Sequence, residues 1–182
     1  MNIEHKEFIS FLKAVQKFQV EYILVGGFSL VFHGYVRGTK DMDIWLRPTN
    51  QNRDKLVKAF EELGFAQGIE ELKQSDFEKM LRFTAGGHPF EIDMMTYISG
   101  VEFDEAIRDA AHFPFEDMNI PVLQLHHLKI NKLAAMRPRD LNDIRELEKI
   151  QLLKESKLPT VNKESNSFFL RLRSKIKSFF TQ

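Results

Sequence analysis

Residues 22–46 read YILVGGFSLVFHGYVRGTKDMDIWL, and the order of features in this stretch decides the expected fold. A short apolar strand, 22–25, is followed directly by Gly26 and Gly27. A helix-like segment, 27–34, begins at this glycine pair. A basic turn and a second apolar strand, 41–46, follow. Backbone N–H groups at a helix N-terminus attract anions, and glycine lets a phosphate approach the backbone closely. The stretch therefore predicts a turn that binds a phosphate-bearing ligand.

The second strand of this stretch carries two acids on one face. Side chains alternate along a strand, so Asp41 and Asp43 project to the same side, together with Trp45. The intervening residues Met42, Ile44 and Leu46 are expected in the core. Two neighbouring carboxylates repel each other unless a cation lies between them. Mg²⁺ prefers oxygen ligands and would remove this conflict.

A later strand, 90–95, repeats the pattern with Glu91 and Asp93 on one face. If it pairs beside the first acidic strand, Asp93 becomes a third ligand. Three carboxylates can hold two metal ions about 3.5–4 Å apart, an arrangement suited to in-line phosphoryl displacement. We expect two Mg²⁺ ions, with Mn²⁺ as an alternative.

Each of these motifs has an ordinary structural explanation when it stands alone. A Gly-Gly pair is usually a tight turn, and Asp-x-Asp is usually a solvated strand edge. Their order, followed by Glu-x-Asp, is more specific. The chain has neither a G-x-G-x-x-G nor a Walker A sequence, and no nucleophile elbow. His126 and His127 are adjacent, so on a helix they are expected to diverge and to make a poor metal pair.

The bulk composition is that of a globular domain. The chain has 182 residues, 43% hydrophobic and 29% charged, with no cysteine and therefore no disulfide or thiolate metal site. Neither a membrane span nor a signal-peptide pattern is evident, so we expect a cytoplasmic protein. The net charge is zero, but residues 156–182 carry six basic side chains against Glu164, a net +5 that leaves −5 on residues 1–155.

Helical and extended patterns alternate along the chain, which predicts an α+β (α/β-like) fold: a short mixed sheet flanked by helices, with a C-terminal helical block. Helices are expected at 4–19, 27–34, 50–63, 102–110, 123–136 and from Pro138 onward, the last burying Leu141, Ile144, Leu147 and Ile150. Strands are expected at 22–25, 41–46, 90–95 and 120–122. Residues 65–88 show no clear pattern beyond a strand around Phe83 and a hairpin turn at Gly86 and Gly87. The expected organisation is a core over 1–122, a helical block over 123–153, a linker over 154–166 and a basic amphipathic helix over 167–182.

The glycine pair, the sequence Arg37-x-Thr39-x-Asp41-x-Asp43 and the later Asp93 together resemble the nucleotidyltransferase superfamily with the DNA polymerase β-like fold. Residues 123–147 are similar to the helical block of its small abortive-infection, toxin-type bacterial members, with Lys132 followed by Arg137, Asp140 and Asp143. The likeness covers roughly residues 5–150. The glycine pair departs from the Gly-Ser found in many members.

This resemblance implies a role for each matching residue. Gly26, Gly27 and Ser29 would contact the triphosphate; Asp41 and Asp43 would bind Mg²⁺. Asp93 would complete the metal site and act as the base. Lys132 would reach phosphate with Asp140 nearby, although an ordinary exposed charge pair explains Lys132 and Asp140 equally well. Arg37 and Lys40 would neutralise phosphates or balance the acids.

The implied function is transfer of a nucleoside monophosphate from an NTP, such as ATP, to an acceptor, with release of pyrophosphate. RNA, a protein or a small molecule could be the acceptor, and a toxin–antitoxin partner protein could be involved. The alternative is a non-catalytic nucleotide-binding or regulatory module. Trp45 or Tyr97 could stack on a base. The basic C-terminal helix could cover its own domain, mediate self-association, or bind RNA or an anionic membrane.

Overall fold

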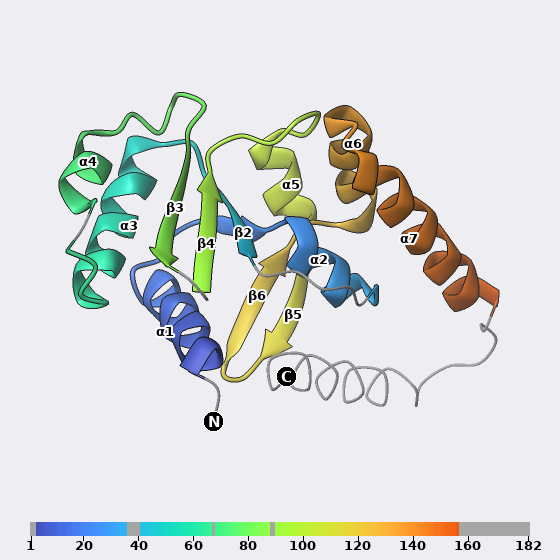
Figure 1. Cartoon of the computed structure of the whole chain (residues 1–182), viewed down its shortest axis with the longest axis horizontal. Coiled ribbons are helices and arrows are strands. Elements are labelled where there is room, and N and C mark those ends of the chain that lie inside the picture. Colours follow the sequence, from blue (N-terminus) through green and yellow to red (C-terminus); the bar gives the residue numbers. More distant parts are fainter. Residues whose placement is uncertain (1–2, 36–40, 67, 88–89, 157–182) are drawn as a thin grey trace.

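The computed structural model describes residues 3–35, 41–66, 68–87 and 90–156 (Figure 1). Helices and strands are interleaved along these residues, as the sequence predicts. The helices are α1 (Ile3–Lys17), α2 (Gly26–His33), α3 (Asn50–Glu62), α4 (Ile69–Gln74), α5 (Phe103–Asp109), α6 (Leu125–Ala135) and α7 (Pro138–Ser156). The strands are β1 (Tyr22–Leu24), β2 (Asp41–Leu46), β3 (Arg82–Gly87), β4 (Phe90–Met95), β5 (Ala111–Phe115) and β6 (Met118–Val122).

The strands form one mixed sheet in the order β3-β4-β2-β1-β6-β5. The central strand β1 pairs antiparallel with β2 and parallel with β6, and β2 pairs parallel with β4. The edge strands β3 and β5 are antiparallel to their neighbours. Such a mixed sheet with helices on its faces confirms the predicted fold class.

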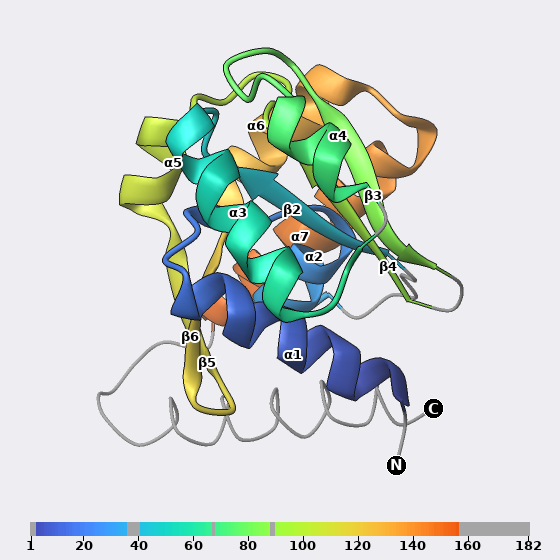
Figure 2. The ribbon, with the colours of Figure 1, turned by 90° about the vertical axis from the view of Figure 1, so that its left-hand side faces the viewer.

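The sheet buries apolar side chains on both faces. Helices α1, α3 and α4 cover one face (Figure 2), where Leu24, Met42 and Ile44 belong to the larger hydrophobic core. Ile23, Val25 and Trp45 point the other way, into a second core with residues of α5, α6 and α7. Asp43 lies between Met42 and Ile44 in the alternating strand, so it faces the side of the sheet that carries α6 and α7.

Two elements were not predicted from the sequence. Helix α4 has six residues, too few for a helical period to stand out, although Ile69 and Leu72 are buried one turn apart. Strand β5 contains Pro114, which usually argues against a strand but is tolerated here at the edge of the sheet. Only residues 120–122 of the β5–β6 hairpin were expected to be extended.

Helix α7 differs from expectation in two ways. Leu141 was expected in the core but is 55% exposed, because the inward stripe of α7 is formed by Asp140, Asp143, Ile144 and Leu147. The helix also continues to Ser156, so residues 154–156 are helical rather than the start of a linker. The rest of the expected linker and the expected C-terminal helix, 167–182, lie outside the described residues.

Candidate active site

The glycine turn lies at the end of the central strand. Strand β1 ends at Leu24, and Gly26 begins α2 with a φ of 61°, in the left-handed region where glycine is favoured. The Val25 N–H donates to the Asp43 main-chain carbonyl over 3.0 Å, which holds the turn beside β2. The Gly27 N–H donates a hydrogen bond to the Asp43 side chain. The turn and the acidic strand are therefore in direct contact.

The carboxylates predicted to act together lie on adjacent strands. In the parallel pairing of β2 and β4, Asp43 is directly opposite Asp93, and Asp41 is opposite Glu91. Burial raises the pKa of Asp43 above its usual value, although the Gly27 N–H opposes this shift, and the charges of Asp93 and Asp41 raise the pKa further. A nearby cation would therefore stabilise the ionised form of the Asp43 carboxyl group.

Two residues that the sequence did not single out hold Asp93. Arg82 Nη2 donates to Asp93 Oδ2 over 2.6 Å, and Thr84 Oγ1 donates to Asp93 Oδ1 over 2.6 Å. Burial raises the pKa of Asp93, but these two hydrogen bonds outweigh it and leave the pKa below its usual value. Arg82 and Thr84 are two residues apart on β3, so a strand assignment for 82–87 would have placed both on one face.

The helical block contributes a buried ionic cluster. Lys132 of α6 is only 6% exposed, and its Nζ lies 3.0 Å from Asp140 Oδ1 and 2.8 Å from Asp143 Oδ2. Because all three residues are buried, an ordinary exposed charge pair does not describe them. Asp140 Oδ2 also accepts from the Arg137 N–H over 3.1 Å, so this carboxylate fixes the junction between α6 and α7.

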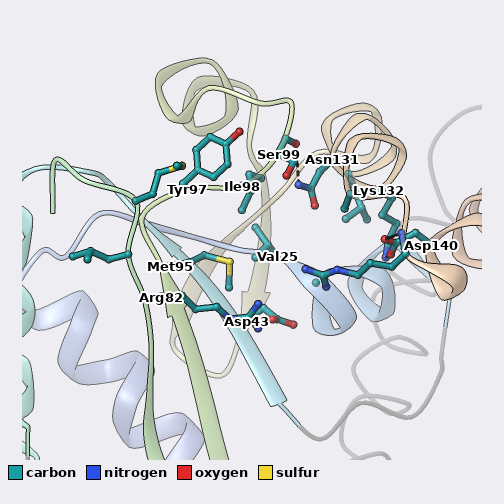
Figure 3. Close-up of a pocket in the computed structure, with 16 residues that line it drawn as sticks. Val25, Asp43, Arg82, Met95, Tyr97, Ile98, Ser99, Asn131, Lys132 and Asp140 are labelled. Atoms are coloured by element: carbon teal, nitrogen blue, oxygen red, sulfur yellow. Dashed lines mark hydrogen bonds and ion pairs between the residues drawn. The ribbon is translucent and has the colours of Figure 1, made fainter.

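One pocket of about 280 Å³ joins the glycine turn, the acidic strand and the helical block (Figure 3). Asp43 and Arg82 lie at the sheet side, and Lys132 and Asp140 lie across from them. Tyr97, Ile98 and Asn131 line the remaining wall, and Arg137 also borders the pocket. Gly26, Asp43, Lys132 and Asp140, four of the predicted site residues, thus surround one space. Asp93 adjoins it through Asp43 and Arg82.

Two residues lie differently from their expected roles. Ser29 is fully buried, and its hydroxyl donates to the Gly26 carbonyl over 2.8 Å, so it fixes the turn in this structure. Trp45 lies on the same face of the strand as Asp43, as expected, but it is 2% exposed in the second core and is not accessible for stacking on a base. Its Nε1–H donates to the Thr96 carbonyl over 3.2 Å. Tyr97 is exposed and lines the pocket, whereas Arg37 and Lys40 lie outside the described residues.

The expectation that His126 and His127 diverge is wrong. Their ring centroids are 3.8 Å apart, and an Nε2 atom of each ring lies within 4.0 Å of Asp109 Oδ2. The two residues occupy the first turn of α6, where the buried His127 and the exposed His126 both reach the end of α5. This cluster lies apart from the residues that line the pocket.

A protein-family model described as "nucleotidyltransferase of unknown function (DUF6036)" matches residues 5–178. The chain belongs to this family. The family match covers nearly the whole chain and confirms the superfamily expected from the motifs. No curated protein matches.

Two solved structures are similar to this family member. A lincosamide antibiotic adenylyltransferase with lincomycin bound has 17% sequence identity and a TM-score of 0.45, with 82% of this chain and 99% of that chain covered. A candidate nucleotidyltransferase from Thermotoga maritima has 13% identity and a TM-score of 0.43, with 86% and 98% covered.

The residues around Asp43 fit the divalent metal that a nucleotidyltransferase would use. All the side-chain donors from Asp41, Asp43 and Asp93 are carboxylate oxygens, the ligands that Mg²⁺ prefers. The space that a Cβ atom on Gly26 would fill is occupied by the Asp43 carboxylate, so the backbone leaves room for this side chain. Burial raises the pKa of Asp43, and the charges of Asp93 and Asp41 add to this shift, so a bound cation would stabilise the ionised carboxylate.

Proposed function

We propose that this family member is a Mg²⁺-dependent nucleotidyltransferase that moves a nucleoside monophosphate from an NTP to an acceptor and releases pyrophosphate. The observation that carries the proposal is the register that sets Asp43 opposite Asp93, beside the glycine turn at Gly26. A phosphate-binding turn and adjacent carboxylates in this arrangement are what phosphoryl displacement requires.

In this proposal the sheet supplies the reacting groups. The N–H groups at the start of α2, of which that of Gly27 donates to Asp43 in this structure, would turn to the triphosphate once Asp43 binds metal, and glycine at 26 and 27 would permit its close approach. Asp41, Asp43 and Asp93 would hold Mg²⁺, for which Mn²⁺ could substitute. When bound, the metal would supply charge neutralisation and a lower pKa for the attacking hydroxyl. Asp93 accepts the proton of that hydroxyl once Arg82 no longer occupies its Oδ2 atom.

The helical block supplies the opposite wall. The Lys132 ammonium group has three donors, and the described residues show two of them directed at Asp140 and Asp143. The third donor is available for a phosphate oxygen, and the two acids keep the ammonium group in place. Arg82 and Arg137 add positive charge at the rim of the pocket. We infer that these cations orient the triphosphate across the space between the sheet and α6.

The experiment incubates the full chain with each α-labelled NTP, Mg²⁺, and separate RNA, protein and small-molecule fractions. Transfer of label to one fraction, with release of pyrophosphate, supports the proposal and identifies the acceptor class. We expect Asp43→Asn to lower the rate by at least about 10²-fold. Asp117→Asn removes an exposed acid that pairs with Lys13 and serves as the matched control. No transfer with any NTP, although nucleotide binds, would exclude the enzymatic proposal.

A second candidate function is a nucleotide-binding or regulatory module without turnover. The ion pair between Arg82 and Asp93 favours it, because a guanidinium group already occupies the carboxylate expected to bind metal. This alternative predicts that NTP binds with equal affinity to the wild type and to Asp43→Asn, and that neither releases pyrophosphate.

A toxin–antitoxin role and a partner protein are proposed only from the likeness to toxin-type members. Expression of the wild type and of Asp43→Asn in separate cultures tests this role, since only an active toxin would arrest growth in an Asp43-dependent way. Among the described residues, no helix is both long enough and apolar enough to cross a membrane. Cytoplasmic location and self-association through residues 167–182 remain predictions.

A further inference from the structure

The cluster formed by Asp109, His126 and His127 joins two helices outside the pocket. One ligand atom from each of the three side chains lies within 4.8 Å of the others. His127 Nε2 lies 3.7 Å from Asp109 Oδ2, and His126 Nε2 lies 4.0 Å from the same oxygen. Asp109 is the last residue of α5, and both histidines are in the first turn of α6.

His127 is the buried member of this cluster. His127 is 2% exposed, and within the described part of the chain its Nδ1 atom has no hydrogen-bond partner. The other ring nitrogen points at two carboxylates, lying 3.7 Å from both Asp109 Oδ2 and Glu105 Oε1. These separations are too long for hydrogen bonds. The Nε2 atom of this buried imidazole therefore faces two carboxylates without a hydrogen bond to either, which leaves its lone pair directed at the centre of the cluster.

Neutral imidazole is the ligating form of histidine, and this position favours it. The positive end of the α6 dipole disfavours an imidazolium in the first helical turn. Burial and the neighbouring His126 lower the pKa of His127, although Glu105 and Asp109 oppose this shift.

We propose that Asp109, His126 and His127 bind one Zn²⁺ ion that clamps the end of α5 to the start of α6. Two imidazoles and a carboxylate are borderline ligands suited to Zn²⁺, whereas Mg²⁺ prefers oxygen ligands alone. Ligand atoms about 2.0–2.1 Å from a tetrahedral ion lie roughly 3.3–3.4 Å apart. The separations of Asp109 Oδ2 from the two Nε2 atoms, 3.7 and 4.0 Å, need to shorten by roughly 0.3–0.7 Å to reach this spacing, and all three ligand atoms already lie within 4.8 Å of one another. Glu105 or water fills the fourth position.

The proposed ion would influence the pocket through α6. Leu128, Asn131 and Lys132 line the pocket on the same helix, directly after the histidines. A clamp at the first turn of α6 would fix the position of this wall relative to α5. This site is distinct from the carboxylates on β2 and β4, because no residue is shared between the two.

The test is calorimetric titration of Zn²⁺ into the full chain after removal of metals with a chelator. Excess Mg²⁺ is present throughout to occupy carboxylate-only sites. We expect one Zn²⁺ per chain, bound at least about tenfold more weakly by His126→Gln and by Asp109→Asn. His126 is exposed, so its replacement is not expected to impair folding. His112→Gln removes an exposed imidazole on β5 and is the matched control, expected to bind as the wild type does.

A spectroscopic measurement distinguishes ligation from a merely structural effect. Co²⁺ in place of Zn²⁺ should give the visible absorption of a tetrahedral ion in the wild type and in His112→Gln, and lose it in His126→Gln. Zn²⁺ should also raise the Tm of the wild type but not that of Asp109→Asn. Absence of stoichiometric Zn²⁺ binding in excess Mg²⁺, or unchanged affinity in both His126→Gln and Asp109→Asn, would overturn the proposal.

Discussion

The Asp43 carboxylate occupies the space that a side chain at position 26 would need: a Cβ atom added to Gly26 would lie 2.0 Å from Asp43 Oδ2. Real Cβ contacts do not reach this distance, so the absence of a side chain at 26 is what allows the carboxylate to lie against the turn. Gly26 also has a φ of 61°. The glycine is therefore required both by its neighbour and by its own backbone.

Comparing Gly26→Ala with Gly64→Ala separates these two requirements. We expect Gly26→Ala to lower the free energy of unfolding by about 2–5 kcal/mol, combining left-handed strain with the clash. Displacement of Asp43 should lower kcat/KM for transfer by about 10²-fold. Gly64→Ala is the control, since Gly64 has a φ of 77° and no described atom within 4 Å of its Cβ position. Gly64→Ala should lower the free energy of unfolding by about 1–2 kcal/mol and leave kcat/KM for transfer unchanged. Equal losses in both variants would contradict the close-approach argument.

Asp43→Asn is expected to stabilise the metal-free protein at neutral pH while removing activity. The pKa of Asp43 is raised in the folded state by burial, then by Asp93 and Asp41. Its contribution to stability is thus fully present below the unfolded pKa and is lost as the pH rises through the folded pKa. Urea unfolding should show the variant more stable at pH 7, with the difference narrowing toward pH 4. Mg²⁺ should raise the Tm of the wild type alone. If Asp43→Asn were less stable than the wild type at pH 7, the expected destabilising effect of the buried Asp43 charge would be wrong.

Lys132→Met tests the ionic cluster between α6 and α7. Removing the ammonium group leaves Asp140 and Asp143 buried without their cation, which typically costs about 3–5 kcal/mol. Denaturant unfolding measures the loss. The matched control is Lys149→Met, which breaks an exposed pair with Glu146 and should cost no more than about 1 kcal/mol. Adding Asp140→Asn and Asp143→Asn to Lys132→Met should recover part of the stability. A loss no larger than that of the control would show that the cluster contributes little.

The aromatic residues Trp45 and Tyr97 should have opposite phenotypes. Tyr97 is exposed on the pocket wall, and stacking on a base is worth about 1–3 kcal/mol, so Tyr97→Ala should raise the KM for NTP at least about fivefold. Trp45→Phe loses volume and the bond to the Thr96 carbonyl, and should lower stability by about 1–3 kcal/mol without changing KM. Steady-state kinetics and thermal unfolding check the pair. If Trp45→Phe alone raised the KM for NTP, Trp45 rather than Tyr97 would be the residue that contacts the nucleotide.

Arg82→Gln tests whether a guanidinium group competes with metal for Asp93. The Arg82 pair with Asp93 is 2.6 Å long and half exposed on the arginine side. Without it, we expect nucleotide-free protein to bind Mg²⁺ up to about tenfold more tightly, because the carboxylate loses a competing cation. Calorimetry measures this affinity. Arg53→Gln, which removes a pair with Asp54 on α3, is the control. Weaker Mg²⁺ binding in Arg82→Gln would mean that Arg82 organises the site.

The sequence predicted the part of the site that is local in the chain. Alternation alone placed Asp43 on the strand face opposite Met42 and Ile44, and the strand bounds 41–46 and 90–95 agree with the structure. The glycine turn was likewise predicted, since both its strand and its helix follow directly in sequence. The alignment of Asp43 with Asp93 was expected only on condition that the two strands pair.

Contacts that depend on tertiary packing were not predicted. Trp45 obeys the same alternation as Asp43, but α5 covers its end of the strand with Phe103, so it is core rather than site. Arg82 was missed because β3 has weak strand character and ends in two glycines. The convergence of His126 and His127 on Asp109 depends on how α5 meets α6, which helical periodicity alone does not describe.

The buried ionic cluster of Lys132, Asp140 and Asp143 has a consequence for how the substrate selectivity of the pocket can change. Lys132, Asp140 and Asp143 tie α6 and α7 into one unit, and that unit meets the sheet chiefly through the pocket wall and the second core. The groups proposed to perform the reaction belong to strands encoded before residue 96. The pocket wall opposite them, with Ile98, Lys132 and Ala135, is encoded after residue 96. Substitutions at wall residues outside the ionic cluster, such as Ile98 and Ala135, can therefore change the shape of the pocket while the carboxylates of the strands stay in place.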